Sequence, residues 1–335
     1  MRKLLLLPFA VICFSCSKKT TTGGGGGPVT PPVPVTPLIT LPQGWKYNTT
    51  YSTGLPNGIQ VFSFDSVYNG KFTKAFCLTY DSKLDRFEFK PVLSATAKTP
   101  MNFFSQETGV TYACINGGYF GGNSSYSLVK YNNTVSSPNI KSVNRTYNGT
   151  STPYYTTRAA FGVSNTGVPS VAWVYSIGAG NDNIYSYPLP SPNAEGSAPQ
   201  PVPDAAFPAG GASWPPVSAI GGSPMLIKDG SINIADVQEL ININNTTSRP
   251  RSAIGYNANG IGMLLAVEGD NTTAGYNGIN LSELANMLQS LSCTHAINLD
   301  GGGSTSLVIA NRLTVRPGDN GTERPVVSAL LIKQK

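Results

Sequence analysis

The stretch that most constrains this chain is residues 298–309, which read N-L-D-G-G-G-S-T-S-L-V-I. An apolar run leads into Asp300, and three glycines, three hydroxyl residues and a β-branched run follow. This order predicts a strand, a sharp turn and a second strand. Three consecutive glycines are costly in backbone entropy, so they indicate positive φ angles or a close approach to another group. The stretch predicts either a tight hairpin with a structural aspartate, or a site where N–H groups, hydroxyls and a carboxylate meet a phosphate or a sugar.

The bulk composition favours a strand-rich secreted protein. The chain has 335 residues, of which 40% are hydrophobic and only 12% are charged, with 36 glycines and 26 prolines. This length is ample for a large buried core. The formal net charge is +6, but the basic residues are scattered and form no stripe. We therefore predict no nucleic-acid binding.

Residues 1–15 have the features of a bacterial lipoprotein signal peptide. Arg2 and Lys3 precede an apolar run that is too short to span a bilayer, and a relaxed lipobox ends at Cys16. We expect Cys16 to be lipidated and to anchor the protein in the bacterial cell envelope, on the periplasmic or the outer surface. A plain secretory signal cut near Ser15 is the alternative.

Two further regions follow the leader. Residues 16–44 are rich in Gly, Pro and Thr, which predicts a tether without chemistry of its own. Residues 45–335 form the predicted domain. Apolar or β-branched runs separated by turn residues predict its strands. These runs span residues 59–65, 72–80, 86–93, 110–116, 158–163, 168–175, 219–228, 252–256, 262–267 and 325–332.

A few helices are expected to cover this sheet structure. Asn280 and Glu283 have the spacing of a capping box, and an apolar stripe that includes Leu284 and Leu288 follows. A short helix is expected near residues 101–108, and residues 180–216 are expected to form a long surface excursion. We predict an α+β fold: a strand-dominated single domain with a few covering helices and a site cleft at the strand ends.

Several kinds of site are absent from the sequence. His295 is the only histidine, which excludes HExxH and multi-histidine metal sites, and no nucleotide-binding phosphate loop is present. Beyond Cys16, the mature chain keeps Cys77, Cys114 and Cys293. We expect three buried thiols, although a Cys77–Cys114 bridge remains open. We expect no cofactor and no metal, so that carboxylates, arginines, asparagines and backbone amides must do any chemistry.

Four segments share a design in which an apolar strand ends in polar or glycine-rich residues. They contain I-N-G-G-Y-F from Ile115, R-S-A-I-G from Arg251, V-E-G-D from Val267 and the stretch from Asn298. With G-G-S-P-M-L, L-S-E-L-A and E-R-P-V in the same order, they resemble the phosphodiester glycosidase family over roughly residues 112–332. That family usually has V-D-G where this chain has V-E-G, so the carboxylate of Glu268 reaches one methylene further.

The resemblance implies hydrolysis of a sugar that is linked through phosphate to another sugar or to an alcohol, with cleavage on the glycosidic side. A carboxylate would activate water or attack the anomeric carbon, and the two candidates are Glu268 and Asp300. Arg251 would bind the phosphate through two N–H groups. The other expected substrate-binding residues are Asn116, Gly117, Gly301, Gly302, Gly303, Ser304, Thr305 and Arg324.

Other interpretations stay open at this point. Asp300 could cap a turn, Arg251 could form an ion pair with Asp300 or Glu268, and oxygen ligands that include Asp270 could hold a divalent ion. From another class, the chain could be a non-catalytic surface glycan-binding lipoprotein, which its 16 tyrosines allow, or an envelope protein that processes polysaccharide. The expected partners are a phosphorylated glycan or sugar phosphodiester, and a membrane through the lipid anchor.

Overall fold

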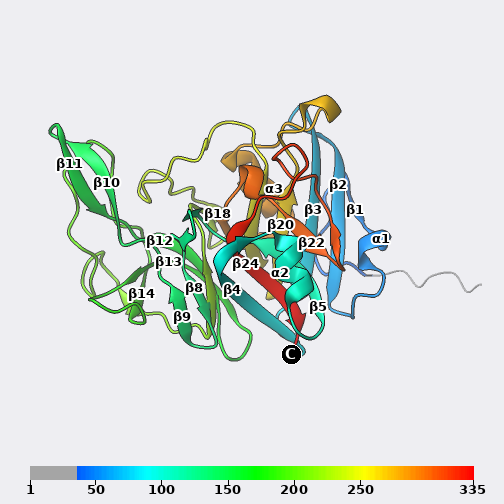
Figure 1. Cartoon of the computed structure of the whole chain (residues 1–335), viewed down its shortest axis with the longest axis horizontal. Coiled ribbons are helices and arrows are strands. Elements are labelled where there is room, and N and C mark those ends of the chain that lie inside the picture. The colour runs from blue at the N-terminus through cyan, green and yellow to red at the C-terminus, as the bar shows by residue number, and fades with distance from the viewer. Residues whose placement is uncertain (1–35) are drawn as a thin grey trace, which may run out of the picture. The chain divides into compact units, whose positions relative to one another are not determined.

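The computed structural model describes residues 36–335, in which Pro37–Lys335 form one compact unit (Figure 1). The predicted signal peptide, Cys16 and most of the predicted tether lie outside the described residues, so the lipid anchor stays a prediction. The last part of the predicted tether already belongs to the folded unit. Leu38 donates its N–H to Gln60 Oε1 at 2.8 Å, and Ile39 is buried. The folded unit therefore begins before Trp45.

The largest sheet has eight strands, which come from both the N-terminal and the C-terminal parts of the described chain. Its order is β1 (Trp45–Tyr47), β2 (Ile59–Tyr68), β3 (Lys71–Asp81), β20 (Ile261–Val267), β19 (Arg251–Asn257), β21 (Cys293–Asn298), β17 (Met225–Lys228) and β18 (Ser231–Ile232). Every neighbouring pair is antiparallel. All residues of β20 are buried, which agrees with its continuous apolar sequence.

Two further sheets complete the main architecture. A five-stranded sheet has the order β23 (Arg312–Leu313), β22 (Leu307–Ile309), β5 (Thr111–Asn116), β24 (Val326–Gln334) and β4 (Phe87–Lys98). A seven-stranded sheet has the order β15 (Ala212–Ser213), β14 (Ile184–Tyr187), β13 (Pro169–Ser176), β12 (Arg158–Val163), β16 (Ser218–Gly221), β8 (Val129–Tyr131) and β9 (Thr134–Ser137). Two small ribbons pair β6 (Phe120–Gly121) with β7 (Ser124–Ser125), and β10 (Ser142–Tyr147) with β11 (Thr150–Tyr155).

The helices are few, as expected, and the strand-dominated character is confirmed. They are α1 (Thr49–Ser52), α2 (Pro100–Gln106), α3 (Leu281–Ser290) and the 3₁₀ turns η1 (Thr272–Ala274) and η2 (Gly302–Ser304). The capping box of α3 is confirmed: Asn280 accepts from the Glu283 N–H, and Glu283 accepts from the Asn280 N–H. Its apolar stripe packs in a cluster that also holds Cys77 of β3 and Ala296 of β21. Thus α3 covers one face of the eight-stranded sheet.

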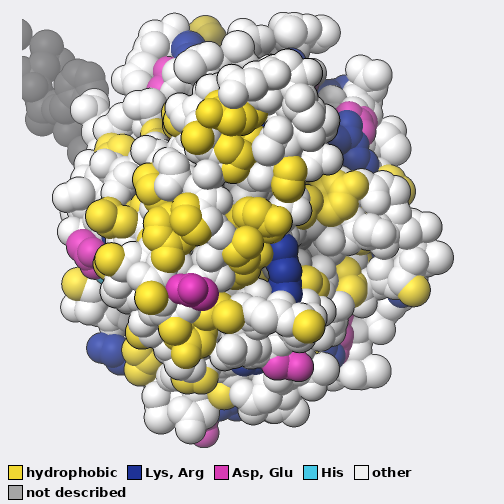
Figure 2. Space-filling view, turned by 90° about the vertical axis from the view of Figure 1, so that its left-hand side faces the viewer, with side chains coloured by type: hydrophobic (Ala, Val, Ile, Leu, Met, Phe, Trp, Pro, Cys, Tyr) yellow, Lys and Arg dark blue, Asp and Glu magenta, His cyan; other side chains and the backbone are white. Residues whose placement is uncertain are grey.

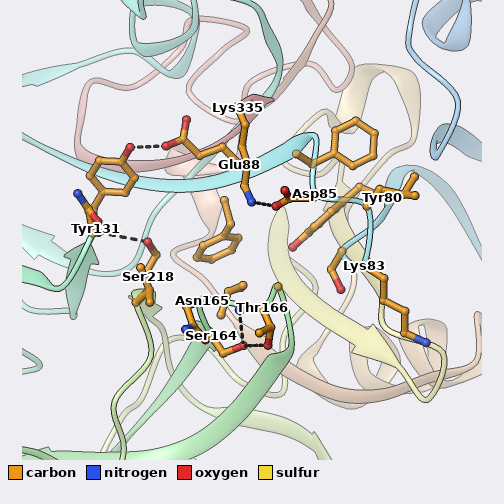
Figure 3. A pocket seen from close by; sticks show the side chains of 18 residues that line it. Tyr80, Lys83, Asp85, Glu88, Tyr131, Ser164, Asn165, Thr166, Ser218 and Lys335 are labelled. Carbon is orange, nitrogen blue, oxygen red and sulfur yellow. Dashed lines mark hydrogen bonds and ion pairs between the residues drawn. The ribbon is translucent and has the colours of Figure 1, made fainter.

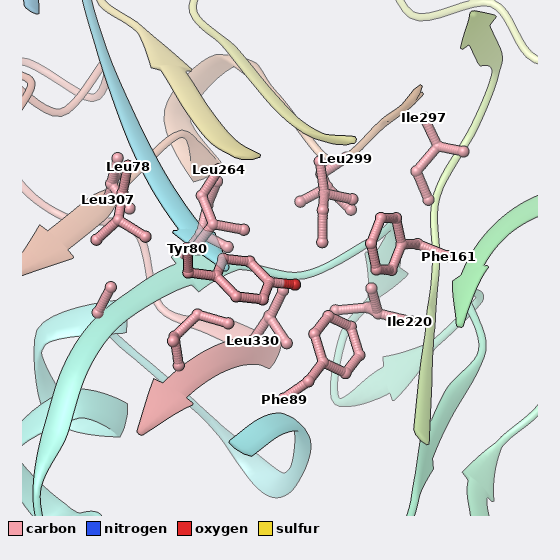
Figure 4. Packing of buried hydrophobic residues seen from close by; sticks show 14 of the residues in the cluster. Leu78, Tyr80, Phe89, Phe161, Ile220, Leu264, Ile297, Leu299, Leu307 and Leu330 are labelled. Atoms are coloured by element: carbon pink, nitrogen blue, oxygen red, sulfur yellow. The ribbon is translucent and has the colours of Figure 1, made fainter. Parts of the chain in front are cut away.

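The main hydrophobic core lies where the three sheets meet. Figure 4 shows side chains from all three: Leu78 and Leu264 come from the eight-stranded sheet, Leu330 from the five-stranded sheet, and Phe161 and Ile220 from the seven-stranded sheet. Each of these residues is almost completely buried. Strands from distant parts of the sequence contribute side chains to this core. Their packing therefore determines which strand ends lie next to one another.

The glycine-rich stretch is not a hairpin. Strand β21 pairs with β19 and β17, whereas β22 pairs with β5 and β23. The turn at residues 299–306 therefore crosses from the eight-stranded to the five-stranded sheet. This crossing leaves Asp300 just beyond the end of β21, as the sequence indicated.

Some local predictions need refinement. The apolar run at residues 219–228 forms two strands, β16 and β17, which belong to different sheets. The excursion at residues 180–216 contains β14 and β15, which extend the seven-stranded sheet. Figure 2 shows the end of the unit where β10, β11 and β14 lie, and many hydrophobic side chains but few charged ones are visible there.

The three cysteines of the described part, Cys77, Cys114 and Cys293, are free and buried, as predicted. Within residues 36–335, no helix is both long and apolar enough to cross a membrane.

Candidate functional site

A pocket of about 410 Å³ opens at the edge of the eight-stranded sheet where β19 begins and β21 ends. Ala253 of β19 pairs with Asn298 of β21, and the two strands are antiparallel. Arg251, two residues before Ala253, and Asp300, two residues after Asn298, therefore lie at the same edge of the sheet. Both residues line the pocket. The full lining is Tyr119, Ile243, Asn244, Arg249, Arg251, Asp270, Asp300, Gly301, Gly302, Gly303, Asp319 and Arg324.

Asp300 is partly buried, and its backbone is held from two sides. Its N–H donates to the Gly117 carbonyl at 3.1 Å, and its carbonyl accepts from Asn116 Nδ2 at 2.7 Å. Burial raises the pKa of the Asp300 carboxyl from 3.8 to about 6, although the Ser304 hydroxyl, the Gly301 N–H and the Arg324 charge oppose this shift. Asp300 forms no ion pair within 4 Å in residues 36–335. Its carboxylate is thus available near neutral pH.

Arg251 is 1% exposed, and only backbone carbonyls hold its guanidinium. Nε donates to Ile279 O at 3.0 Å, Nη1 to Ile243 O at 3.3 Å, and Nη2 to Asn244 O at 2.7 Å and Thr247 O at 3.1 Å. Burial lowers the pKa of Arg251 to about 10.

No carboxylate of the described chain lies within 4 Å of Arg251, so the ion pair with Asp300 or Glu268 that the sequence left open is not formed. Because guanidinium has five N–H groups, one on Nη1 remains for a ligand.

The other two arginines of the pocket are matched by carboxylates. Arg324 binds Asp319 with two hydrogen bonds of 2.7 and 2.8 Å, and Arg249 lies 3.5 Å from Asp270. The Arg324–Asp319 pair lies directly on Gly303, where a Cβ would overlap both side chains. A side chain at this position would have to displace the flexible ends of both residues. The pocket therefore keeps one positive charge, that of Arg251, without a carboxylate partner.

The glycine-rich turn uses most of its own N–H groups. Gly301 donates to Asp300 Oδ1 at 2.9 Å and Gly302, at φ +58°, to Pro250 O at 2.9 Å. Ser304 and Thr305 donate to the carbonyls of Gly301 and Gly302, and both side chains are buried away from the pocket lining. Of the expected cradle of amides, only the N–H of Gly303 has no hydrogen-bond partner in residues 36–335.

Glu268 is 1% exposed and is not among the residues that line the pocket. Its Oε1 accepts from Asn271 Nδ2 at 2.8 Å, and its Oε2 accepts from the Arg316 N–H at 3.1 Å and lies 3.3 Å from Lys74 Nζ. Three partners therefore occupy this carboxylate. The structure does not bring Glu268 and Asp300 to the same cavity wall.

Asn116 and Gly117 also lie behind the pocket wall. Asn116 Nδ2 donates to the carbonyls of Gly117 and Asp300, and its Oδ1 accepts from Ser252 Oγ at 2.7 Å and from the Ser306 N–H at 3.2 Å. All of its hydrogen-bonding capacity is used, and a Cβ on Gly117 would overlap Ser328. These two residues position the backbone of Asp300 instead of contacting the cavity.

Tyr119 is the main pocket residue that the sequence did not single out. Its hydroxyl donates to Ser223 O at 2.6 Å and accepts from Asn298 Nδ2 at 2.7 Å. Burial raises the pKa of Tyr119 further above its ordinary value, and the Asp300 charge adds to this effect. The motif I-N-G-G-Y-F contains this tyrosine, so a signal was present. Asp319 and Arg249 carried no such signal, because only the fold shows that Asp319 pairs with Arg324 and Arg249 with Asp270.

No group of three or more His, Cys, Asp or Glu side chains in residues 36–335 is arranged to hold a metal ion. In particular, the carboxylate set of Asp300, Glu268 and Asp270 that the sequence left open does not converge.

Comparison with known proteins places the chain in a family. Residues 110–333 match the family model described as phosphodiester glycosidase. The bovine and human proteins named N-acetylglucosamine-1-phosphodiester alpha-N-acetylglucosaminidase are each 34% identical over 116 residues, which is 32% of this chain. The matched segment spans 21% and 22% of their lengths, so it represents about a fifth of these curated relatives.

Solved structures show a similar fold at low sequence identity. The zebrafish N-acetylglucosamine-1-phosphodiester alpha-N-acetylglucosaminidase catalytic domain, auto-inhibited by its pro-peptide, has a TM-score of 0.56 and 16% identity over 87% of this chain and 89% of that one. A hypothetical protein from Synechocystis has a TM-score of 0.57 and 19% identity over 84% and 63%. Because the family model matches more than half of the chain, this protein belongs to the phosphodiester glycosidase family.

Proposed function

We propose that this protein hydrolyses the glycosidic bond of a sugar-1-phosphodiester, such as N-acetylglucosamine linked through phosphate to a sugar or an alcohol. One observation carries the proposal. Asp300, with a carboxyl pKa of about 6, shares a pocket with Arg251, a buried cation that no carboxylate neutralises. The family membership and the printed names of the curated relatives support the same reaction.

The charge of the pocket suits a phosphodiester. This group carries one negative charge, and the arginines at 249 and 324 are already paired with carboxylates. The donors without a partner that a phosphate oxygen could use include the remaining N–H on Arg251 Nη1, the N–H of Gly303 and the Nη1 group of Arg324, whose bonds to Asp319 come from Nε and Nη2. A hydrogen bond from guanidinium to phosphate is stronger than a neutral one, and it is strengthened further where water is scarce.

In the proposed step, Asp300 is the general base. It takes a proton from water, the water oxygen forms a bond to the anomeric carbon, and the bond from that carbon to the phosphate oxygen breaks. The products are the free sugar and a phosphomonoester. Phosphate leaves readily as an anion, so the reaction needs little help from a general acid. A base with a pKa near the working pH combines an ionised state with useful proton affinity.

Glu268 has a positioning role in this proposal. Its bond to the Arg316 N–H fixes the segment that leads to Asp319, and Asp319 in turn holds Arg324 at the pocket. The longer side chain, where the family usually has aspartate, reaches this segment from the end of β20. The same segment is thus anchored to the eight-stranded sheet.

The test is turnover of a panel of methyl sugar-1-phosphates by the full chain, with the released sugar and methyl phosphate followed by NMR. We expect Asp300→Asn to lower kcat by about 10²- to 10⁴-fold, the usual effect of losing a general base. Asp182→Asn, a change of an exposed aspartate outside the pocket, is the matched control. We expect kcat/KM of the wild type to fall below pH 6, because protonated Asp300 cannot accept a proton.

Two outcomes would contradict the proposal. Wild-type turnover by Asp300→Asn would exclude Asp300 as the base. Binding of the phosphodiesters without release of sugar would favour the non-catalytic glycan-binding alternative.

A further inference from the structure

Glu239 is a fully buried carboxylate in the segment between β18 and β19. Its Oε1 accepts from the Met225 N–H at 2.8 Å and from Trp173 Nε1 at 2.9 Å. Its Oε2 accepts from the Ala159 N–H at 3.2 Å and from the Ser223 hydroxyl. Both oxygens are therefore occupied, and the three N–H groups among these partners can only donate. The proposed hydrolysis assigns no role to this carboxylate.

The charge of Glu239 depends on these hydrogen bonds. Burial raises the pKa of its carboxyl, and the Met225 N–H, the Ser223 hydroxyl and the Arg158 charge oppose this rise. Within residues 36–335, Glu239 forms no ion pair within 4 Å. Burying a charge is costly unless hydrogen bonds compensate it. The carboxylate therefore ties the turn at residues 223–225 firmly to strands β12 and β13, which carry two of its donors.

The turn that Glu239 holds carries the acceptor of the Tyr119 hydroxyl. The Ser223 carbonyl accepts from Tyr119 at 2.6 Å and from Asn298 Nδ2 at 2.9 Å. Asn298 Nδ2 also donates to the Tyr119 hydroxyl at 2.7 Å. Tyr119 is thus connected to Glu239 through the single residue Ser223, and to the strand end that leads to Asp300 through Asn298.

Tyr119 presents its ring to the pocket of Asp300. The residue is partly exposed and lines this pocket, whereas its hydroxyl is buried, which raises its pKa well above the ordinary value. Among the residues that line the pocket, only Tyr119 and Ile243 have aromatic or aliphatic side chains. Sites for small molecules combine such surface with a few polar groups, and the C–H groups of a sugar ring can pack on an aromatic face. The ring of Tyr119 therefore suits the sugar, whereas the free N–H groups suit the phosphate.

The Tyr119 ring lies beside the general base of the proposed reaction. Its hydroxyl is 3.4 Å from the carbonyl oxygen of Leu299, the residue before Asp300. The Asp300 N–H donates at 3.1 Å to the carbonyl of Gly117, two residues before Tyr119. These two contacts hold Tyr119 and Asp300 next to each other. A sugar whose anomeric carbon faces Asp300 is therefore within reach of the Tyr119 ring.

We propose that Glu239 is a positioning residue, which acts through Ser223 to hold the Tyr119 ring where the sugar of the substrate packs. The proposal rests on hydrolysis of a sugar-1-phosphodiester in the Asp300 pocket, and it extends that function to the side of the pocket that binds the sugar. Glu239 itself does not touch the substrate. Because the ring contacts the sugar equally before and during the reaction, its placement affects KM and leaves kcat nearly unchanged.

A similar contact at another pocket provides the matched control. Figure 3 shows a pocket of about 630 Å³ that shares no lining residue with the pocket of Asp300. In it the Tyr131 hydroxyl donates to Glu88, so that a carboxylate again holds a tyrosine. Glu88→Gln changes this contact and leaves the partners of Tyr119 intact.

The experiment is a double-mutant cycle with the full chain. It measures kcat and KM for methyl N-acetylglucosamine-1-phosphate, or for whichever methyl sugar-1-phosphate of the panel the wild type hydrolyses faster. The variants are Glu239→Gln, Tyr119→Leu and the combination of the two. We expect Tyr119→Leu to raise KM about tenfold, which is on the order of one aromatic contact. We expect Glu239→Gln to raise KM about fivefold, the effect of one neutral hydrogen bond, and to change kcat less than about twofold.

The combination separates positioning from a general loss of stability. In the Tyr119→Leu background, Glu239→Gln should raise KM no further, because the ring that it positions is absent. The melting temperature should fall with Glu239→Gln in both backgrounds, since the glutamine amide faces an N–H group that the carboxylate accepted from. Ser223→Ala removes only the hydroxyl that joins Ser223 to Glu239. It takes the place of Glu239→Gln in the cycle if that variant does not fold, with the same expected pattern in KM.

Three results would overturn the inference while the proposed function stands. One is a wild-type KM in folded Glu239→Gln or Ser223→Ala. Another is an equal rise of KM from Glu239→Gln with and without the Tyr119 ring, because the carboxylate would then act on the pocket by another route. The last is a similar rise of KM in Glu88→Gln, which would show that the effect is not specific to Glu239. Absence of turnover by the wild type with every methyl sugar-1-phosphate would instead refute the proposed function, and the inference with it.

Discussion

Asp300 lowers the stability of the folded protein at neutral pH, and replacing it with asparagine is expected to reverse this effect. The carboxyl has a pKa of about 6 in the folded chain against an ordinary value of 3.8, because burial disfavours its charge. Asn has nearly the same shape, and its Oδ1 can still accept from the Gly301 N–H. The substitution therefore removes the buried charge and leaves the turn intact.

The size of the effect follows from the pKa. A rise from 3.8 to about 6 corresponds to about 3 kcal/mol of unfolding free energy at neutral pH. We expect about 2 kcal/mol, because the carboxyl still faces the pocket and its solvent. Below pH 3.8 the carboxyl is protonated in both the folded and the unfolded state, so Asp300 does not lower the unfolding free energy. Between pH 3.8 and 6 the folded state binds more protons than the unfolded state, so stability falls as pH rises. Above pH 6 the unfolding free energy has fallen by the full amount.

The measurement is urea unfolding of the wild type and of Asp300→Asn at pH 4, 5, 6 and 7. The difference in unfolding free energy is expected to be close to zero at pH 4 and to favour the variant by about 2 kcal/mol at pH 7. Asp182→Asn, in which an exposed aspartate changes, serves as the control and should show no such pH dependence. A variant that is less stable than the wild type at pH 7, or a difference independent of pH, would refute the reasoning.

Two further substitutions test the pocket wall. Gly303→Ala places a methyl group against the flexible ends of Arg324 and Asp319, which can move aside. We therefore expect a melting temperature within about 3 °C of that of the wild type. We also expect KM to be about tenfold higher, which corresponds to about 1.4 kcal/mol of lost phosphate binding. An unchanged KM would show that the phosphate does not reach this wall. Glu268→Gln loses the charge facing Lys74 but keeps an acceptor for the Arg316 N–H. We expect the unfolding free energy to fall by about 1 kcal/mol. We expect kcat to change by less than about threefold, because the segment that Glu268 positions stays anchored and Glu268 does not line the pocket. A hundredfold loss of kcat in a folded variant would instead make Glu268 catalytic.

Local sequence patterns predicted most of the secondary structure. The uninterrupted apolar run of β20 and the capping residues of α3 act over a few neighbouring residues, so their signals are complete in the sequence. The crossing of the chain between two sheets after β21 was not predictable in this way. A strand, a turn and a strand look alike in sequence whether the strands pair with each other or with distant partners, because pairing depends on long-range contacts.

For the candidate site too, some features could be predicted from the sequence and others depend on the tertiary structure. The sequence alone identified Asp300 and Arg251 as chemical groups at strand ends and related the chain to its family. Only the tertiary structure decided that Asp300 faces the pocket while Glu268 and Asn116 face their own partners behind it. It also decided the pKa of Asp300, because the solvent that a carboxyl loses depends on every segment packed around it. The sequence determines which chemical groups are present. The direction in which each side chain points, its hydrogen-bond partners and its loss of solvent depend on contacts between segments far apart in the chain.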